Sequence, residues 1–217
     1  MKNAETPVIK LVLYGAMSSL GSALMAEFLR RQHEVIAILD DLTALAPRPG
    51  LRTKSGDLFD AERVKQSVAG GDLVVCLLDA PGLPMGSEQV EKLRICDSLE
   101  QVRAIDALIA GMQATQVQRL FVVGDFEVLD STQPRDPLQH HAAQEILDAL
   151  QTSTLRWTLV NAPRGVPGLG IEHFSQVSSS LEPGLAEPLQ RLNSVAIGIA
   201  DELRLNLHLR EHVQFVS

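Results

Sequence analysis

Short apolar runs alternate with longer helix-like stretches along most of the 217 residues, and this alternation limits the chain to few folds. Each run has the length and the density of branched side chains that are typical of a buried strand. The runs lie at 8–14, 34–40, 51–57, 72–80, 119–125 and 155–161. Strands that alternate with helices form right-handed crossover units in one parallel sheet. The pattern therefore predicts an α/β fold with a doubly wound parallel sheet.

The stretches between these runs repeat apolar side chains at the spacing of a helix. The predicted helices are 19–32, 60–69, 138–151, 189–204 and 87–114, the last of them either continuous or in two pieces. No internal repeat or linker divides the chain, so we expect a single domain over residues 1–217 with a short C-terminal elaboration. Residues 162–188 are rich in proline and glycine, which predicts a substrate-side loop region that closes over a ligand.

The composition argues against several classes of function. A net charge of −8 and a pI near 5.2 do not suit a nucleic-acid groove, because phosphate binding requires a basic surface. No apolar stretch approaches the roughly 18 residues of a membrane helix, and the start of the chain lacks a secretory signal pattern. Cys76 lies within the apolar run LVVCLLDA, which favours a buried thiol over a disulfide. We expect a cytoplasmic protein that binds neither nucleic acid nor membrane.

The strand-like run VIKLVLY leads directly into GAMSSLG, the segment with the clearest chemical meaning. Gly15 permits a tight turn, and Gly21 permits close packing of the following helix on the sheet. The helix N-terminus offers N–H groups and the positive end of its dipole to a pyrophosphate. Ser18 and Ser19 can cap this helix or donate to a phosphate. The alternative is an ordinary capped turn between a strand and a helix.

Two aspartates follow predicted strands at positions where a dinucleotide would lie. Asp40 ends the second strand, about 20 residues beyond the glycine turn, where a carboxylate can accept both ribose hydroxyls of NAD and repel the 2′-phosphate of NADP. Asp57 follows the third strand and can hold the adenine amino group. The alternatives are a solvated strand end for Asp40 and a helix N-cap for Asp57.

No metal or hydrolase pattern is present in the sequence. His141 and Glu145 share one helix face, but no third ligand follows at a suitable spacing, so we predict no metal site. A serine hydrolase is also not indicated, because no GxSxG elbow occurs.

Several segments together match one family. They are VLYGAMSSLGSALMAEFLRRQHEVIAILDD, SGDLFDAERVKQSVAGGDLVVCLL, RAIDALIAGMQATQVQRLFVVG, LRWTLVNAP and SVAIGIADEL. With them the chain resembles, nearly end to end, the atypical short-chain dehydrogenase/reductases called NAD(P)H-binding proteins. This group includes the biliverdin-reductase-B-like and nitrogen-metabolite-regulator-like proteins. The resemblance implies a Rossmann-like fold that binds NAD or NADP along the strand ends.

The resemblance also implies cofactor contacts, carried over position by position. The pyrophosphate is expected at Gly15, Met17, Ser18, Ser19, Leu20 and Gly21. The ribose is expected at Asp40, the adenine at Asp57 and Leu58, and the nicotinamide side near Leu78, Asp79 and Ala80.

The chain departs from the family pattern at three places. Met17 and Ser18 replace Thr-Gly in the turn, and the Ser18 Cβ would narrow the approach to a pyrophosphate or oppose a positive φ. Asp40 stands where many relatives have Arg, which favours NAD over NADP, or no cofactor at all. Pro137 and His141 occupy the positions of the family's Tyr-x-x-x-Lys dyad.

Two functions follow from these observations. The first is an oxidoreductase that reduces a small carbonyl, quinone or flavin-like acceptor, with Asp125 or His141 as candidate acid or with a proton from solvent. The second is a non-catalytic dinucleotide-sensing or protein-binding module with a degenerate Rossmann fold. A sugar-nucleotide epimerase is not indicated, because those enzymes normally need the Tyr/Lys pair. The 87–114 stretch could support a homodimer interface.

Overall fold

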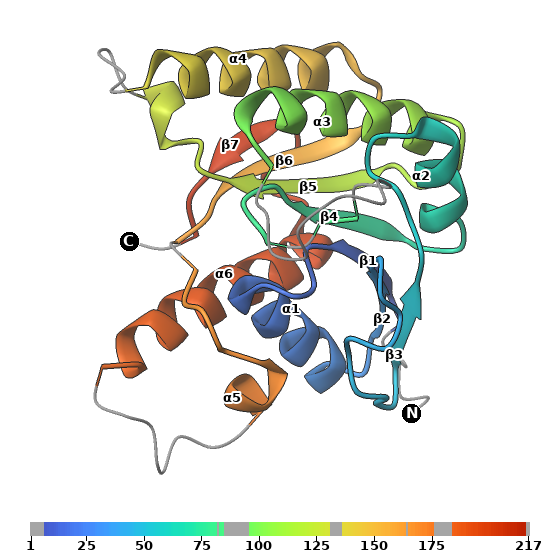
Figure 1. The fold of residues 1–217 in the computed structure, drawn as a ribbon, viewed down its shortest axis with the longest axis vertical. Coiled ribbons are helices and arrows are strands. Elements are labelled where there is room, and N and C mark those ends of the chain that lie inside the picture. Colours follow the sequence, from blue (N-terminus) through green and yellow to red (C-terminus); the bar gives the residue numbers. More distant parts are fainter. Residues whose placement is uncertain are drawn as a thin grey trace.

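The computed structural model describes residues 7–81, 83–84, 96–130, 136–163, 165–175 and 184–215. A parallel sheet forms the centre of the protein, and helices cover both of its faces (Figure 1). The strands are β1 (Lys10–Tyr14), β2 (Glu34–Ile38), β3 (Leu51–Lys54), β4 (Leu73–Leu77), β5 (Arg119–Gly124), β6 (Arg156–Asn161) and β7 (Glu211–Val213). The helices are α1 (Ser19–Arg30), α2 (Ala61–Val68), α3 (Ser98–Gln113), α4 (Pro137–Thr152), α5 (Ile171–Ser175), α6 (Ala186–Leu205) and the short 3₁₀ helix η1 (Glu127–Asp130).

The strands of the described residues pair in the order β3-β2-β1-β4-β5-β6-β7, and every neighbouring pair is parallel. The chain leaves β1 toward β2 on one side, and returns to β4 on the other. Ligands of such sheets bind outside the carboxyl ends of the strands, at this switch point. The predicted doubly wound α/β fold is confirmed. β4 is buried along its whole length, as expected of a parallel strand covered on both faces.

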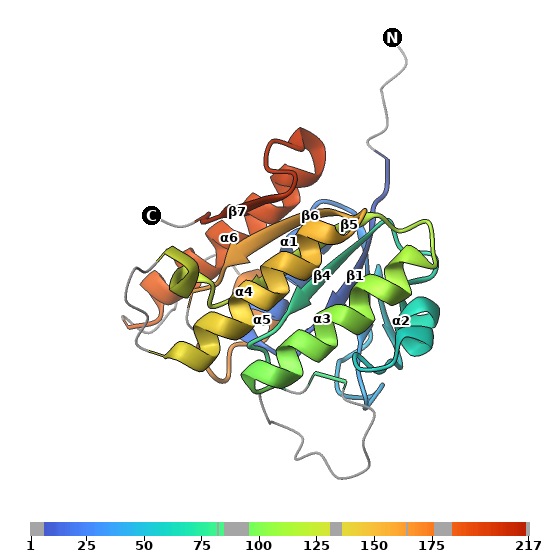
Figure 2. The same cartoon turned by 90° about the horizontal axis from the view of Figure 1, so that it is seen from above.

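The helices divide between the two faces of the sheet (Figures 1 and 2). On one face α1 packs against α5 and α6; on the other, α3 packs against α2 and α4. The core lies between these layers and the sheet. Phe28 of α1 and Phe121 of β5 are among its largest fully buried side chains. Among the described residues, no helix is both long enough and apolar enough to cross a membrane.

Polar side chains cap the starts of α2, α3 and α4. Asp60 caps α2, and Asp136 caps α4 with Pro137 in the first turn. Asp97 and Glu100 form a reciprocal capping box at the start of α3. An unbroken helix over 87–114 is therefore wrong, because Cys96 and Asp97 precede the helix. Residues 85–95 of that prediction lie outside the described residues.

The C-terminal elaboration adds one helix and one strand, α5 and β7, to the predicted pattern. Within 162–188, residues 171–175 form α5, and the last helix begins at Ala186 rather than at 189. Residues 164 and 176–183 of this segment lie outside the described part of the chain. β7 adds to the sheet edge beside β6. The interpretation of 162–188 as a substrate-side loop region stays a prediction.

Candidate dinucleotide site

The two glycines of GAMSSLG are both required by the geometry of the turn. Gly15 has a φ of +89°, and a Cβ there would lie 2.7 Å from the Cβ of Ala80 and 2.8 Å from that of Leu77. A Cβ on Gly21 would lie 2.4 Å from the carbonyl oxygen of Gly15. Real Cβ atoms do not approach other atoms this closely, so the backbone of the turn lies directly against both its own helix and the end of β4.

Ser18 is the N-cap of α1. Its hydroxyl donates to the Gly15 carbonyl at 2.8 Å and accepts the Gly21 N–H at 2.9 Å. Its φ of −82° is an ordinary extended value. The position thus does not require the positive φ that we considered from the sequence, and serine is accommodated without backbone strain.

The first turn of α1 leaves two N–H groups open. No oxygen atom in the described part of the chain accepts the backbone N–H of Ser19 or Leu20. Helix N-termini of this kind bind phosphate through such groups and through the helix dipole. Ser19 is buried, and its hydroxyl accepts the N–H of Val166 at 3.1 Å. That bond leaves the hydroxyl hydrogen of Ser19 available to a ligand.

The residues expected at the adenosine end lie after β2 and β3, beside the turn. Asp40 is exposed, and Asp41 accepts bonds from the backbone and the hydroxyl of Thr43. Asp57 accepts the N–H of Phe59 at 2.8 Å. The N-cap of α2 is Asp60, so the alternative reading of Asp57 as that cap is wrong.

Leu58 and Leu78, which the family resemblance places at the cofactor, both lie in the hydrophobic core. Leu58 is fully buried, and its N–H donates to the Pro84 carbonyl at 2.8 Å. Leu78 is also buried and donates its N–H to the Val123 carbonyl at 2.9 Å. Both side chains therefore belong to the hydrophobic core, and their N–H groups already donate to backbone carbonyls.

A polar cluster lies at the ends of β4 and β5. The Asp79 carboxylate accepts the backbone N–H of Asp125 at 2.7 Å and the side-chain amide of Gln101 at 3.1 Å. The Asp125 carboxylate accepts the amide of Gln139 at 3.1 Å. We call these four residues the carboxylate cluster. It joins β4 and β5 to α3 and α4 at the carboxyl edge of the sheet.

The pKa of Asp79 is raised above its ordinary value. Desolvation of its carboxylate between β4, β5 and α3 is the main cause; the charge of Asp125 adds to it, and the two accepted hydrogen bonds oppose it. The residue as a whole retains an exposed surface. Both carboxylate oxygens accept hydrogen bonds, one from Gln101 and one from the Asp125 backbone.

Other groups that the sequence offered for catalysis lie elsewhere. The side chain of His141 is 71% exposed and faces Glu145 at 3.4 Å on the surface of α4. Tyr14 is fully buried and shares a hydrogen bond of 2.5 Å with Ser67, and burial raises the pKa of its phenol. The structure therefore brings Asp79 and Asp125 together, but it places neither His141 nor Tyr14 beside them.

A cavity of about 340 Å³ borders the glycine turn on the α1 side of the sheet. Met17 and Met25 line one wall, residues 44–46 with Arg48 another, and residues 168–172 a third. Arg48 and Glu172 face each other across it at 3.4 Å. No member of the carboxylate cluster lines this cavity, so it is separate from the ends of β4 and β5.

Comparison with known families matches residues 15–166 to the sequence profile described as NAD(P)H-binding. The chain belongs to the NAD(P)H-binding family. The matched region begins at Gly15, in the turn before α1, and ends at Val166. The N–H of Val166 donates to the hydroxyl of Ser19, at the start of α1. The tight turn at Gly15 and Gly21 and the open N–H groups of α1 fit the phosphates of such a cofactor.

Solved structures share the fold of this NAD(P)H-binding protein. The oxidoreductase YlbE from Lactococcus lactis has a TM-score of 0.65 at 14% identity, with 95% of this chain and 90% of that chain covered. WbmH from Bordetella bronchiseptica, solved with NAD⁺, has a TM-score of 0.62 at 16% identity, with 97% and 76% covered. A Streptococcus pneumoniae protein provisionally described as an NADH-flavin reductase has a TM-score of 0.60 at 21% identity, with 95% and 98% covered. At these identities the likeness shows the fold alone. No curated protein matches the sequence.

Sequence reasoning missed several polar residues at the carboxyl edge. Gln101 and Gln139 bind the two aspartates of the carboxylate cluster, and Asn161 contacts His212 at the ends of β6 and β7. Only Asn161 carried a signal, because it is the polar last residue of the predicted strand 155–161. The other contacts join residues far apart in the sequence, which no local pattern reveals.

Proposed function

We propose that this protein is an oxidoreductase of the atypical short-chain type, which uses NADH to reduce a small carbonyl, quinone or flavin-like acceptor. The observation that supports it best is the carboxylate cluster, which lies at the strand ends beside a turn with open N–H groups. A phosphate-binding turn alone would suit any nucleotide-binding module. Acid groups held next to the expected nicotinamide position suit a reaction that consumes a proton.

The chain's own residues would hold the cofactor in an extended form along the sheet edge. Ser19 and Leu20 donate backbone N–H groups to the pyrophosphate, and Asp40 accepts the ribose hydroxyls. Asp57 and Leu58 lie at the adenine, and Ala80 at the nicotinamide end. When bound, NADH would supply a hydride to the acceptor.

The residues around the ribose favour NAD over NADP. Asp40 and Asp41 place two carboxylates where a 2′-phosphate would lie, and like charges repel. Met17, 42% exposed, presents an apolar surface at the turn. The cation that lines the neighbouring cavity, Arg48, is already paired with Glu172.

Proton delivery falls to Asp125 in the absence of a tyrosine at the dyad position. Its residue is exposed to solvent, whereas both oxygens of Asp79 already accept hydrogen bonds. The reduced acceptor takes one hydride and one proton, and Asp125 regains its proton from water. Asp79 holds the Asp125 backbone in place.

The test is a fluorescence titration with NADH and NADPH, followed by NADH oxidation with menadione, FMN and small aldehydes. We expect a micromolar Kd for NADH and at least tenfold weaker binding of NADPH, a difference of about 1.4 kcal/mol.

Three variants extend this test. Asp40→Asn should reduce the ratio of the NADPH Kd to the NADH Kd. Asp125→Asn should lower kcat about 100-fold, within the usual range for loss of a general acid, without changing the NADH Kd. Asp148→Asn, on the exposed surface of α4, is the matched control. Binding of neither nucleotide would refute the proposal.

A second candidate is a dinucleotide-sensing module without catalysis. Pro137 and the surface-exposed His141 at the two dyad positions favour it. This alternative predicts tight NADH binding with no oxidation by any acceptor, and an Asp125→Asn variant that behaves as the wild type.

A further inference from the structure

Asn161 is a polar residue at the carboxyl edge that lies outside the carboxylate cluster. It is the last residue of β6 and lies opposite Gly124 of β5. Only 6% of its surface is exposed. Side-chain amides buried to this degree normally have their hydrogen bonds satisfied. Here Oδ1 contacts His212 Nε2 at 2.9 Å, whereas Nδ2 donates to no residue in the described part of the chain.

The Nδ2 atom of Asn161 is nevertheless not enclosed. Among the described residues, the fully buried side-chain nitrogens without a partner are Arg119 Nε and Trp157 Nε1. Asn161 Nδ2 is not among them and therefore reaches the surface. The amide is thus largely buried, with a donor that no described residue accepts, and such a donor suits an acceptor atom on a ligand.

His212 fixes this orientation. Its ring packs edge-on against Phe126, with centroids 6.4 Å apart, and its Nδ1 lies 3.9 Å from a carboxylate oxygen of Asp130. A ring held on these sides keeps Nε2 directed at Asn161. With its proton on Nε2, the imidazole donates to Oδ1 and prevents the amide from turning its oxygen outward.

Asn161 faces the same side of the sheet as the carboxylate cluster. Register partners on neighbouring parallel strands point to the same face, so the Asn161 side chain and a Cβ on Gly124 share a direction. That Cβ would lie 3.3 Å from Asp79 Oδ2. The Asn161 donor is therefore one strand beyond β5, on the side away from the glycine turn.

We propose that Asn161 is a substrate-binding residue whose Nδ2–H donates to an oxygen of a small neutral quinone, and that His212 is its positioning residue. The inference rests on the proposed reductase function. A quinone has a second oxygen remote from the one reduced beside Asp125. It also carries no negative charge, which the carboxylates of Asp79, Asp125 and Asp130 would repel.

The experiment compares four variants with menadione as acceptor and NADH saturating. Asn161→Leu removes the donor at similar volume; His212→Phe keeps the ring contact with Phe126 but loses the N–H. Both should raise the KM for menadione about tenfold, with kcat changed less than about threefold and the NADH Kd unchanged. His212→Gln, whose amide can donate to Asn161, should restore most of the affinity. Ser194→Ala on the surface of α6 is the control.

A spectroscopic readout separates this inference from the proposed function. The side-chain amide resonance of Asn161, identified by its loss in Asn161→Leu, should move when menadione is added to the NAD⁺ complex. Movement with NAD⁺ alone, or no movement with either, overturns the assignment. If menadione moves the resonance but no NADH is oxidised, the reductase proposal fails while the binding role of Asn161 stands. An unchanged menadione KM in both Asn161→Leu and His212→Phe would refute the positioning pair.

Discussion

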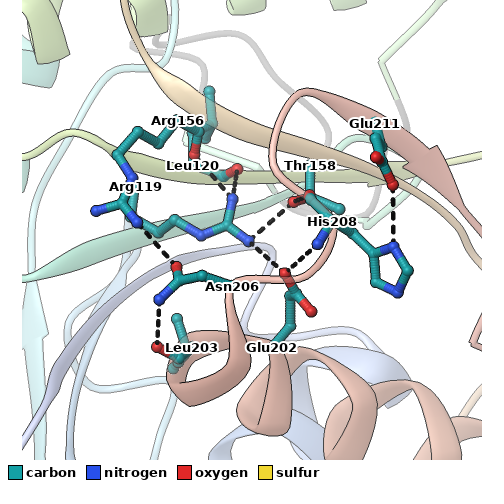
Figure 3. Close-up of polar contacts among 9 residues, drawn as sticks. All are labelled: Arg119, Leu120, Arg156, Thr158, Glu202, Leu203, Asn206, His208 and Glu211. Carbon is teal, nitrogen blue, oxygen red and sulfur yellow. Dashed lines mark hydrogen bonds and ion pairs between the residues drawn. The ribbon is translucent and has the colours of Figure 1, made fainter.

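The polar groups at the carboxyl and amino edges of the sheet differ in the hydrogen bonds that they make within the fold. At the carboxyl edge, the N–H groups of Ser19 and Leu20 and the Nδ2 donor of Asn161 have no partner in the described part of the chain. At the amino edge, the charged side chain of Arg119 is buried within a network of hydrogen bonds (Figure 3). The first arrangement leaves donors open to a ligand. The second bonds the terminal guanidinium nitrogens of Arg119 within the fold, while Arg119 Nε and Trp157 Nε1 stay buried with no partner among the described residues.

The network around Arg119 joins the starts of β5 and β6 to the end of α6 (Figure 3). The guanidinium donates to the Arg156 carbonyl and to the Thr158 hydroxyl, both at 2.8 Å. It also lies 3.9 Å from the ring centroid of Phe121 and 3.7 Å from the carboxylate of Glu202, which is 2% exposed. Desolvation lowers the pKa of Arg119 to about 10, although the Glu202 charge opposes the shift.

The same network attaches the C-terminal segment to the sheet. Glu202 accepts the backbone N–H of His208 at 2.7 Å, and Thr158 donates to the His208 carbonyl. A charge buried in this way is tolerated only while its partners remain. The comparison therefore predicts that substitutions at the amino edge change stability without changing binding, and that those at the carboxyl edge do the reverse.

The largest effect is expected from Glu202→Gln. It leaves the Arg119 charge buried without a counter-charge, which costs about 3–5 kcal/mol of unfolding free energy. Denaturant unfolding monitored by circular dichroism measures this. Glu187→Gln on the same helix is the matched control, because its pair with Arg191 is exposed and should contribute at most about 1 kcal/mol. Equal losses in the two variants would contradict a special role for the buried pair. The NADH Kd should not change in either.

Gly15→Ala should have the largest effect on binding. The substitution imposes a Cβ at a φ of +89° and within 2.7 Å of Ala80, so the turn must shift. We expect the NADH Kd to rise on the order of 100-fold, about 2.8 kcal/mol. Gly70→Ala is the control, because Gly70 has a φ of +86° but no atom within 4 Å of the added Cβ. It should lower stability modestly and leave the Kd unchanged; a similar loss of affinity there would show that strain alone explains the result.

The strands of the sheet could be predicted from the sequence, but the hydrogen bonds between residues at its two edges could not. Each predicted strand is present, because apolar runs such as LVVCL are buried whatever their neighbours are. The start of α3 depended on the capping box at Asp97, which a search for apolar periodicity does not detect. The bond between Arg119 and Thr158 spans 39 residues, and that between Asn161 and His212 spans 51. Such contacts follow from the strand order, which the local pattern does not specify.

Ser19→Ala tests how strongly the carboxyl edge depends on one hydroxyl. The substitution removes the acceptor of the Val166 N–H and a donor that faces the expected pyrophosphate, while the backbone N–H groups of α1 remain. A net loss of about 1 kcal/mol for one hydrogen bond corresponds to an NADH Kd about fivefold higher. In the control Ser194→Ala, the lost hydroxyl donates to the Gln190 carbonyl of its own helix, so the NADH Kd should not change. An unchanged Kd for Ser19→Ala would mean that the backbone groups alone hold the phosphate.

The smallest effect is expected at Ser18, where the chain departs from the glycine of its family. Ser18 has a φ of −82°, and its hydroxyl already caps α1, so restoring glycine relieves no strain. Ser18→Gly should change the NADH Kd by less than about threefold and cost only a few tenths of a kcal/mol in stability, whereas Ser18→Ala should cost about 1 kcal/mol because it removes the cap. The comparison needs both Kd and thermal unfolding. A Kd that falls tenfold or more in Ser18→Gly would show that the serine had impaired the phosphate site, and the turn would then be a weakened form of the family's.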